Sequence, residues 1–256
     1  MIPGAGYALG VLRLHRRGDR WPVVRTTAFG GAVVVAAVAL GPPVGSHDGD
    51  VRVHVAQHLA VAMLVPLLLA LSAPVTLALR TFPRRARRRL LAALHSRPAA
   101  VLTHPLLLVV ADVGGAYALY LGPLYDLAGR RLWLHVVVHV HMLLTGGALS
   151  WVLAGRDPAP RPLRTRDRLV LLVVAGTGHD VLARLMYAEG RPRGAGSPGQ
   201  LHTAAELLAY GGDAIDTAVA VAVLTAWYAR RGRELHRSAR RGRAGAGAGG
   251  ATRLAA

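Results

Sequence analysis

The 256-residue sequence contains no cysteine and no lysine. Without cysteine the chain forms no disulfide, thiolate metal site or thiol nucleophile, so histidine, methionine, carboxylates or backbone must hold any bound metal. Without lysine, all 31 basic residues are arginine, against 13 acidic residues, and the formal net charge is +18. In a soluble protein this charge would indicate nucleic-acid binding. Here the arginines stand in blocks between apolar runs that leave little soluble surface, so we expect no nucleic-acid partner.

Apolar runs dominate the sequence, which is 53% hydrophobic. A helix of about 20 apolar residues crosses the roughly 30 Å hydrocarbon core of a lipid bilayer. Six runs approach or exceed this length, and they predict complete transmembrane helices over residues 23–41, 51–72, 106–121, 132–153, 168–187 and 201–227. The stretch 1–14 is apolar but too short to cross, and it predicts a truncated N-terminal helix. The expected fold is therefore all-α, a polytopic membrane helix bundle over residues 1–229.

The arginines are distributed unequally between the two sides of these spans. Segments 13–25, 80–97, 156–168 and 230–253 hold 25 of them, whereas the opposite loops hold five and Arg184 lies inside a span. Because cytoplasmic loops carry the excess of basic residues, we expect the arginine-rich side and the C-terminus to be cytoplasmic and the protein to be multi-pass in the plasma membrane. Residues 230–256, rich in Arg, Gly and Ala, are expected to be a disordered tail.

Two pairs of histidines lie near the external ends of two predicted spans. His54 and His58 begin the span 51–72, and His135 and His139 begin the span 132–153. Residues four apart share a helix face, and histidine within a span is costly and typically functional. One such pair can ligate a metal ion. Pairs on two helices therefore predict a four-nitrogen site, although imidazoles that merely cap helix ends are the alternative.

Further candidate ligands lie on the same and later spans. His179 sits near the middle of the span 168–187, and the accessory candidates are Met142, His202, Asp213 and Asp112. In the absence of cysteine, this histidine and methionine set favours copper or zinc over an iron–sulfur cluster. The carboxylates would orient ligating imidazoles, carry protons or join helices. Asp180 and Arg184, four residues apart, are expected to pair with each other.

Other aromatic and imidazole side chains are assigned no chemistry. His141 points about 200° away from His139 around the helix, at 100° per residue, and is expected to be structural. Tyr117, Tyr120 and Tyr125 stand near an external end and fit an aromatic belt at the membrane interface.

Short motifs follow one another in a fixed order along nearly the whole chain. They are Trp21-Pro22, His54-x-x-Gln57-His58, Pro66 and Pro74, His104-Pro105, Tyr117-x-x-Tyr120, Pro123-Leu-Tyr125-Asp126, His135-x-x-x-His139-x-His141, Gly155-Arg-Asp157-Pro158, Gly178-His179 and Gly212-Asp213. In this order they resemble the CtaG family of polytopic assembly factors for caa-type cytochrome c oxidase. The resemblance implies a protein that is not an enzyme and that delivers copper to the oxidase subunit carrying the externally facing copper centre. It implies metal-handling roles for His54, His58, His135, His139 and His179.

Two other functions stay open at this point. A b-type haem needs axial histidines from two helices at matching depth, and His54 with His135, or His58 with His139, would supply them to an electron carrier. A proton-coupled transporter would need a carboxylate path, for which Asp112, Asp180 and Asp213 are the candidates. No inverted repeat is detectable in the sequence, which counts against the transporter.

Overall fold

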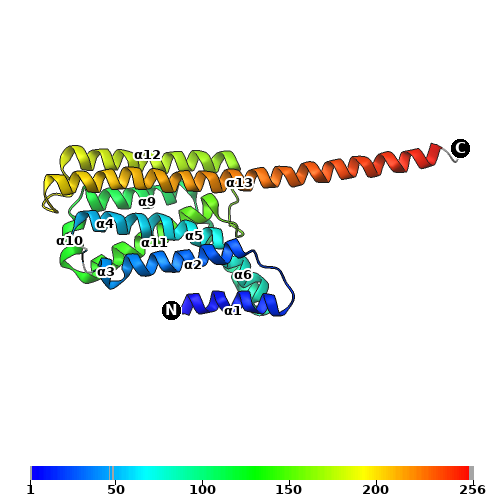
Figure 1. Ribbon diagram of the computed structural model, residues 1–256, viewed down its shortest axis with the longest axis horizontal. Coiled ribbons are helices and arrows are strands. Elements are labelled where there is room, and N and C mark those ends of the chain that lie inside the picture. Colours follow the sequence, from blue (N-terminus) through cyan, green and yellow to red (C-terminus); the bar gives the residue numbers. More distant parts are fainter. Residues whose placement is uncertain (1, 46, 48, 254–256) are drawn as a thin grey trace.

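A computed structural model describes residues 2–45, 47 and 49–253 of the chain. Within these residues every regular element is a helix, as the sequence predicts. Figure 1 shows the long helices running alongside one another, with α13 continuing beyond the bundle. The elements are α1 (Ile2–Arg16), α2 (Val23–Leu40), α3 (Pro42–Gly45), α4 (Val51–His58), the π-helix η1 (Leu59–Leu64), α5 (Val65–Ser72), α6 (Pro74–Thr81), α7 (Arg84–Leu94), α8 (Arg97–Leu102), α9 (Pro105–Tyr120), α10 (Leu124–Arg130), α11 (Leu132–Ala154), α12 (Thr165–Glu189) and α13 (Pro198–Arg253).

The bundle has two ends of different character. At one end lie α3, α10 and the first turns of α4 and α11, which carry the two histidine pairs (Figure 1); we call this the histidine end. At the other end lie α6, the arginine-rich helix α7 that follows it, and the exit of α13 from the bundle; we call this the arginine end. The arginine-rich segments therefore lie at one end of the bundle, as the sequence predicts.

Five helical segments of the described chain are long and apolar enough to cross a membrane. They are Val23–Leu40, Val51–Thr81, Leu132–Ala154, Thr165–Glu189 and Pro198–Leu235. A sixth span results when α9 and α10 are taken together, and these two helices bend by 74° at their junction. The bend follows Gly122-Pro123, where proline interrupts the helical hydrogen-bond pattern. The polytopic bundle is thus confirmed, with the predicted span 106–121 forming part of the bent pair and α1 being shorter than a span.

The segment that carries the first histidine pair is not a regular helix. α4 passes into the π-helix η1 directly after His58, and α5 ends at Ser72, before Ala73, which has a left-handed backbone with φ of 53°. A new helix, α6, begins at Pro74, and Val51–Thr81 as a whole still forms one candidate span. Proline lacks an N–H and cannot continue a regular helix. The carboxylate of Asp157 accepts the backbone N–H groups of Val75 and Thr76, which caps the new helix.

The hydrophobic core is divided along the length of the bundle. One cluster lies around the histidines and includes Val55, Leu119 and Leu182, and a second lies nearer the arginine end and includes Leu67, Leu153 and Val223. A smaller cluster joins α1 to α6 around Tyr7 and Trp21. The histidine site is therefore built within a packed interior and is not confined to the rim of the bundle.

Two arginine-rich segments outside the apolar spans contain helix. Residues 80–97, expected to connect two spans, include the helix α7, whose side chains are not buried. α13 continues as a helix through Arg253, and the expected disorder of residues 230–256 stays a prediction. The boundary between bundle and tail at residue 230 stays a prediction.

Candidate metal centre

The first histidine pair is fixed by both ends of α4. Asp50 caps the helix by accepting the backbone N–H of Arg52 at 2.9 Å, and its carboxylate also pairs with the Arg52 guanidinium. Hydrogen bonding to Arg52 lowers the pKa of Asp50 to about 2. Further along, the buried Gln57 donates to the carbonyl oxygen of Ala39 in α2 at 3.0 Å. His54 and His58 are buried as well, against Tyr120.

The second pair extends the site from α11. The imidazole rings of His135 and His139 lie with their centroids 4.4 Å apart, as expected for residues one turn apart on one face. Nδ1 of His139 lies 3.0 Å from the carbonyl oxygen of His135. A carbonyl only accepts, so Nδ1 carries the proton and Nε2 is the nitrogen with a lone pair for a metal. Tautomer control of this kind is typical of metal-binding histidines.

The two pairs meet across the interface between α4 and α11. The ring centroid of His54 lies 5.9 Å from that of His139 and 6.3 Å from that of His135. His58, one turn deeper on α4, lies 6.2 Å from His179 of α12. The structure therefore brings together all five histidines that the sequence singles out. They form a line, which we call the histidine line, from the histidine end of the bundle into its interior.

A buried carboxylate terminates the histidine line. Nδ1 of His179 donates to the carbonyl oxygen of Ala175 at 3.2 Å, which leaves Nε2 facing Asp112 at 3.9 Å from its Oδ2 atom. Asp112 also accepts a hydrogen bond from the Thr145 hydroxyl at 3.3 Å. Asp112 therefore faces the unprotonated nitrogen of His179 at a distance too long for a hydrogen bond.

Two imidazole nitrogens of the line lack protein partners. Nε2 of His54 and Nδ1 of His58 are buried without a hydrogen bond, and the hydroxyl of Tyr120 is in the same position. Buried polar atoms are almost always satisfied, so orphaned atoms call for an explanation such as an ion or water. Imidazole nitrogens of this kind fit copper or zinc. However, within the described residues no three His, Cys, Asp or Glu side chains are grouped closely enough to hold one metal ion.

Tyr120 belongs to this site although the sequence assigned it only to an aromatic belt. It is fully buried, with its ring centroid 6.1 Å from His54 and 5.5 Å from His58. Tyr125, after the bend between α9 and α10, lies 5.0 Å from His54. The Tyr117-x-x-Tyr120 and Pro123-Leu-Tyr125 motifs contained both residues. Their inward orientation depends on the rotation of α9 and on the bend after it, which the sequence pattern does not specify.

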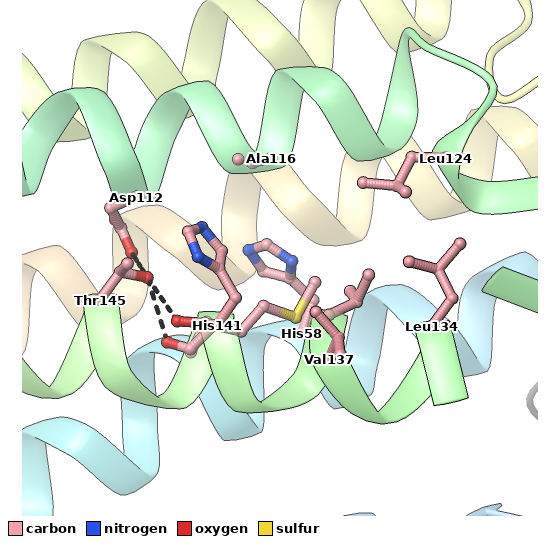
Figure 2. Close-up of a pocket in the computed structure, with 12 residues that line it drawn as sticks. His58, Asp112, Ala116, Leu124, Leu134, Val137, His141 and Thr145 are labelled. Atoms are coloured by element: carbon pink, nitrogen blue, oxygen red, sulfur yellow. Dashed lines mark hydrogen bonds between the residues drawn. The ribbon is translucent and has the colours of Figure 1, made fainter. Parts of the chain in front are cut away.

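The accessory candidates separate into two groups. Met142 and Asp112 line a cavity of about 230 Å³ together with His58 and His141. Figure 2 shows the side chains of His58 and His141 among those lining this cavity, with Asp112 and Thr145 at one side. The ring of His141 is also held by a hydrogen bond of 3.0 Å between its Nε2 atom and the carbonyl oxygen of Ala111. This agrees with the structural role expected for His141.

The other two accessory candidates lie away from the histidine line. His202 stacks on Tyr187, with ring centroids 4.1 Å apart. Asp213 lies in an open groove between α12 and α13, whereas Asp216, three residues later, lines a small cavity with Asp112 and His179. Residues three apart differ by only about 60° around the axis, so Asp213 and Asp216 lie at the two borders of one face of α13, the first toward the open groove and the second toward the interior. Asp180 likewise faces the open groove and pairs with Arg184 at 2.9 Å, as predicted.

A wide opening at the histidine end gives access to the line. A cavity of about 710 Å³ is lined by His54 and His135, together with Tyr125, Asp126 and Arg193. Its volume greatly exceeds that of a single hydrated ion. The first imidazoles of the line are thus reachable from the same end of the bundle, while His58 and His179 lie deeper.

The chain matches the model of one protein family over residues 5–230, which covers the bundle and both histidine pairs. That family is described as the cytochrome c oxidase caa3 assembly factor family. The chain belongs to this family. The earlier resemblance to this family is thereby confirmed.

Relatives of this chain occur in mycobacteria. Uncharacterised proteins of Mycobacterium bovis and Mycobacterium tuberculosis are each 37% identical to it over 180 residues, and one of Mycobacterium leprae is 34% identical over the same length. These alignments cover 67% of the present chain but only 27% of each relative. The chain thus spans about a quarter of the length of these curated relatives. No solved structure gives a significant match.

Proposed function

We propose that this assembly factor handles copper for cytochrome c oxidase through the histidine line, and that it does so as a carrier and not as an enzyme. The observation that supports this most strongly is the convergence of five histidines from α4, α11 and α12, two of which have buried nitrogens without a partner. Histidine in a membrane span is costly unless it has a function. Copper here is cargo, bound on arrival and released to a client.

The spacing of the rings suits a cargo better than a permanent cofactor. Neighbouring imidazole rings lie with their centroids 4.4 to 6.3 Å apart, so each pair offers two nitrogens to a copper ion. Within the described chain, no three metal-binding side chains are grouped closely enough to hold one ion. A carrier must bind copper tightly enough to take it up and weakly enough to release it. Several weak neighbouring sites satisfy both requirements. His139 would receive the ion through Nε2, and His54 would share it.

The proposed client is the oxidase subunit with the externally facing copper centre. The wide cavity lined by His54 and His135 opens at the histidine end. If the arginine end faces the cytoplasm, as the excess of basic residues there suggests, the cavity opens on the outer side of the plasma membrane. Copper would then leave on the side where the client needs it.

A copper titration tests the proposal. The detergent-purified protein is titrated with Cu(I) against a competing chromophoric chelator. We expect His58→Ala with His139→Ala to remove the bound copper. The matched control is His95→Ala with His104→Ala, which removes two exposed imidazoles outside the line and should leave the stoichiometry unchanged. Equal copper binding by both double variants would exclude the histidine line as the site.

A visible spectrum of the same preparation distinguishes copper handling from the main alternative, a b-type haem carrier. A b-type haem held by two of these histidines would give a Soret band in protein purified from haem-replete cells. We expect none, because the rings of His54 and His139 pack edge to face with centroids 5.9 Å apart. A stoichiometric Soret band that is lost in the His58→Ala and His139→Ala variant would favour the electron carrier instead.

A further inference from the structure

Most of the lateral surface of the bundle is apolar, as a bilayer requires. On α2 the exposed large side chains include Val33, Val34 and Val38, and on α9 they include Leu106 and Val110. Side chains of this kind need no partner other than lipid tails.

The groove between α12 and α13 departs from this pattern. It has a volume of about 410 Å³ and is lined by four ionisable side chains, with Tyr187 and Tyr210 beside them: Asp180, Arg184, Glu206 and Asp213. We call it the acidic groove. Asp180 and Arg184 pair with each other, yet 77% of the Arg184 side chain stays exposed. Glu206 and Asp213 are exposed, and neither has an ion pair or hydrogen bond within the described part of the chain.

These charges lie at membrane depth. α12 ends and α13 begins at the histidine end. With a rise of 1.5 Å per residue, Asp180 lies about 14 Å from the end of α12, and Glu206 and Asp213 lie about 12 and 22 Å from the start of α13. Those depths fall inside an apolar layer of about 30 Å. Ionisable residues in spans almost always face protein or water, because exposure to hydrocarbon is strongly unfavourable.

We propose that the acidic groove is the docking surface for a transmembrane helix of another membrane protein, and that this helix carries an arginine or lysine near the middle of its span. The groove contains three carboxylates and one guanidinium, so its net charge is negative. A cationic side chain at that depth would pair with Glu206 or Asp213. The exposed Tyr210 ring, 74% accessible, would pack against the partner, since tyrosine is enriched at interfaces.

A second copy of this chain fits the groove less well. In a twofold dimer the same surface patch meets itself. Two copies would bring together six carboxylates and only two guanidinium groups, and this excess of negative charge opposes association. The proposal concerns a face separate from the histidine line and does not depend on copper handling.

The absence of cysteine allows a specific test. Gly199→Cys, where a Cβ meets no atom within 4 Å, gives one labelling site near the groove for energy transfer in phosphatidylcholine vesicles. The probes are 22-residue leucine-alanine helices with arginine, leucine or glutamate at the centre. We expect the arginine peptide to associate about tenfold more strongly than the leucine peptide, the scale of a polar contact between membrane helices. Glu206→Gln with Asp213→Asn should abolish this preference.

The control variant removes the same charge elsewhere. Asp126→Asn with Glu189→Gln neutralises two exposed carboxylates outside the groove and should keep the preference for arginine. If the double groove variant fails to fold, Glu206→Gln and Asp213→Asn alone should each lose part of the preference. Equal association of the arginine and leucine peptides, or a preference that survives the groove substitutions, would overturn the proposal. Self-association of the labelled protein that disappears in the groove variant would also overturn it, in favour of a second copy.

Discussion

Gly146 offers the sharpest test of how the helices that carry the histidines pack together. It lies on α11 one turn beyond Met142, and α11 is so close to η1 there that a Cβ on Gly146 would collide with the carbonyl oxygen of Ala62. That oxygen lies in the π-helical segment, four residues before Pro66, which has no N–H to donate to it. Close approach of α11 therefore requires glycine at this position.

The next residue provides a matched control. A Cβ on Gly147 meets no atom within 4 Å. Both Gly146→Ala and Gly147→Ala gain the same helix propensity, about 1 kcal/mol. The difference in unfolding free energy between the two variants therefore measures the cost of the collision alone. Because the obstructing atom is backbone and cannot rotate away, we expect an overpacking cost of about 1–3 kcal/mol for Gly146→Ala relative to Gly147→Ala.

Thermal unfolding in detergent micelles measures this difference. For a chain of this size, each kcal/mol shifts the midpoint by about 2–4 °C, so the Gly146→Ala midpoint should lie about 2–12 °C below that of Gly147→Ala. Copper affinity should fall in Gly146→Ala only, because α11 carries His139. Equal midpoints for the two variants would refute the packing of α11 against η1 described above.

Three further outcomes are expected. Ala73→Gly should raise the thermal midpoint, because relief of the left-handed backbone is worth about 1–2 kcal/mol. Asp157→Ala should lower it by the loss of a helix cap, about 0.5–2 kcal/mol, whereas Thr76→Val should lose only the hydroxyl contact. Arg52 holds the pKa of Asp50 at about 2, below its ordinary value of 3.8, so the ionised form stabilises the folded state above that ordinary value and the contribution disappears as the pH falls through 2. Unfolding midpoints measured from pH 5 to pH 2 should therefore fall less in Asp50→Asn than in the parent protein; parallel profiles would contradict this.

The sequence alone was sufficient to predict the apolar spans and to single out the five histidines that lie together in the structure. Apolar runs of about 20 residues are a direct requirement of the bilayer. The i,i+4 spacing of His54 with His58, and of His135 with His139, fixes a shared helix face without any tertiary information. The pairing of Asp180 with Arg184 followed from the same spacing rule.

The remaining features depend on how each helix is rotated and bent, which periodicity does not specify. The rotation of α9 places Tyr120, and the bend after α9 places Tyr125, next to His54, where the sequence suggested only an interfacial belt. The rotation of α13 places Asp216 inside and Asp213 outside. Apolar residues surround both carboxylates in sequence, so their hydropathy contexts are nearly identical.

X-ray absorption at the copper edge of the Cu(I)-loaded protein tests the central claim most directly, because it reports the ligands of the bound ion. We predict a first shell of nitrogen with the outer scattering typical of imidazole, and loss of that signal together with the copper in His58→Ala with His139→Ala. Copper coordinated without imidazole, or an imidazole signal unchanged in that double variant, would contradict the assignment of copper to the histidine line.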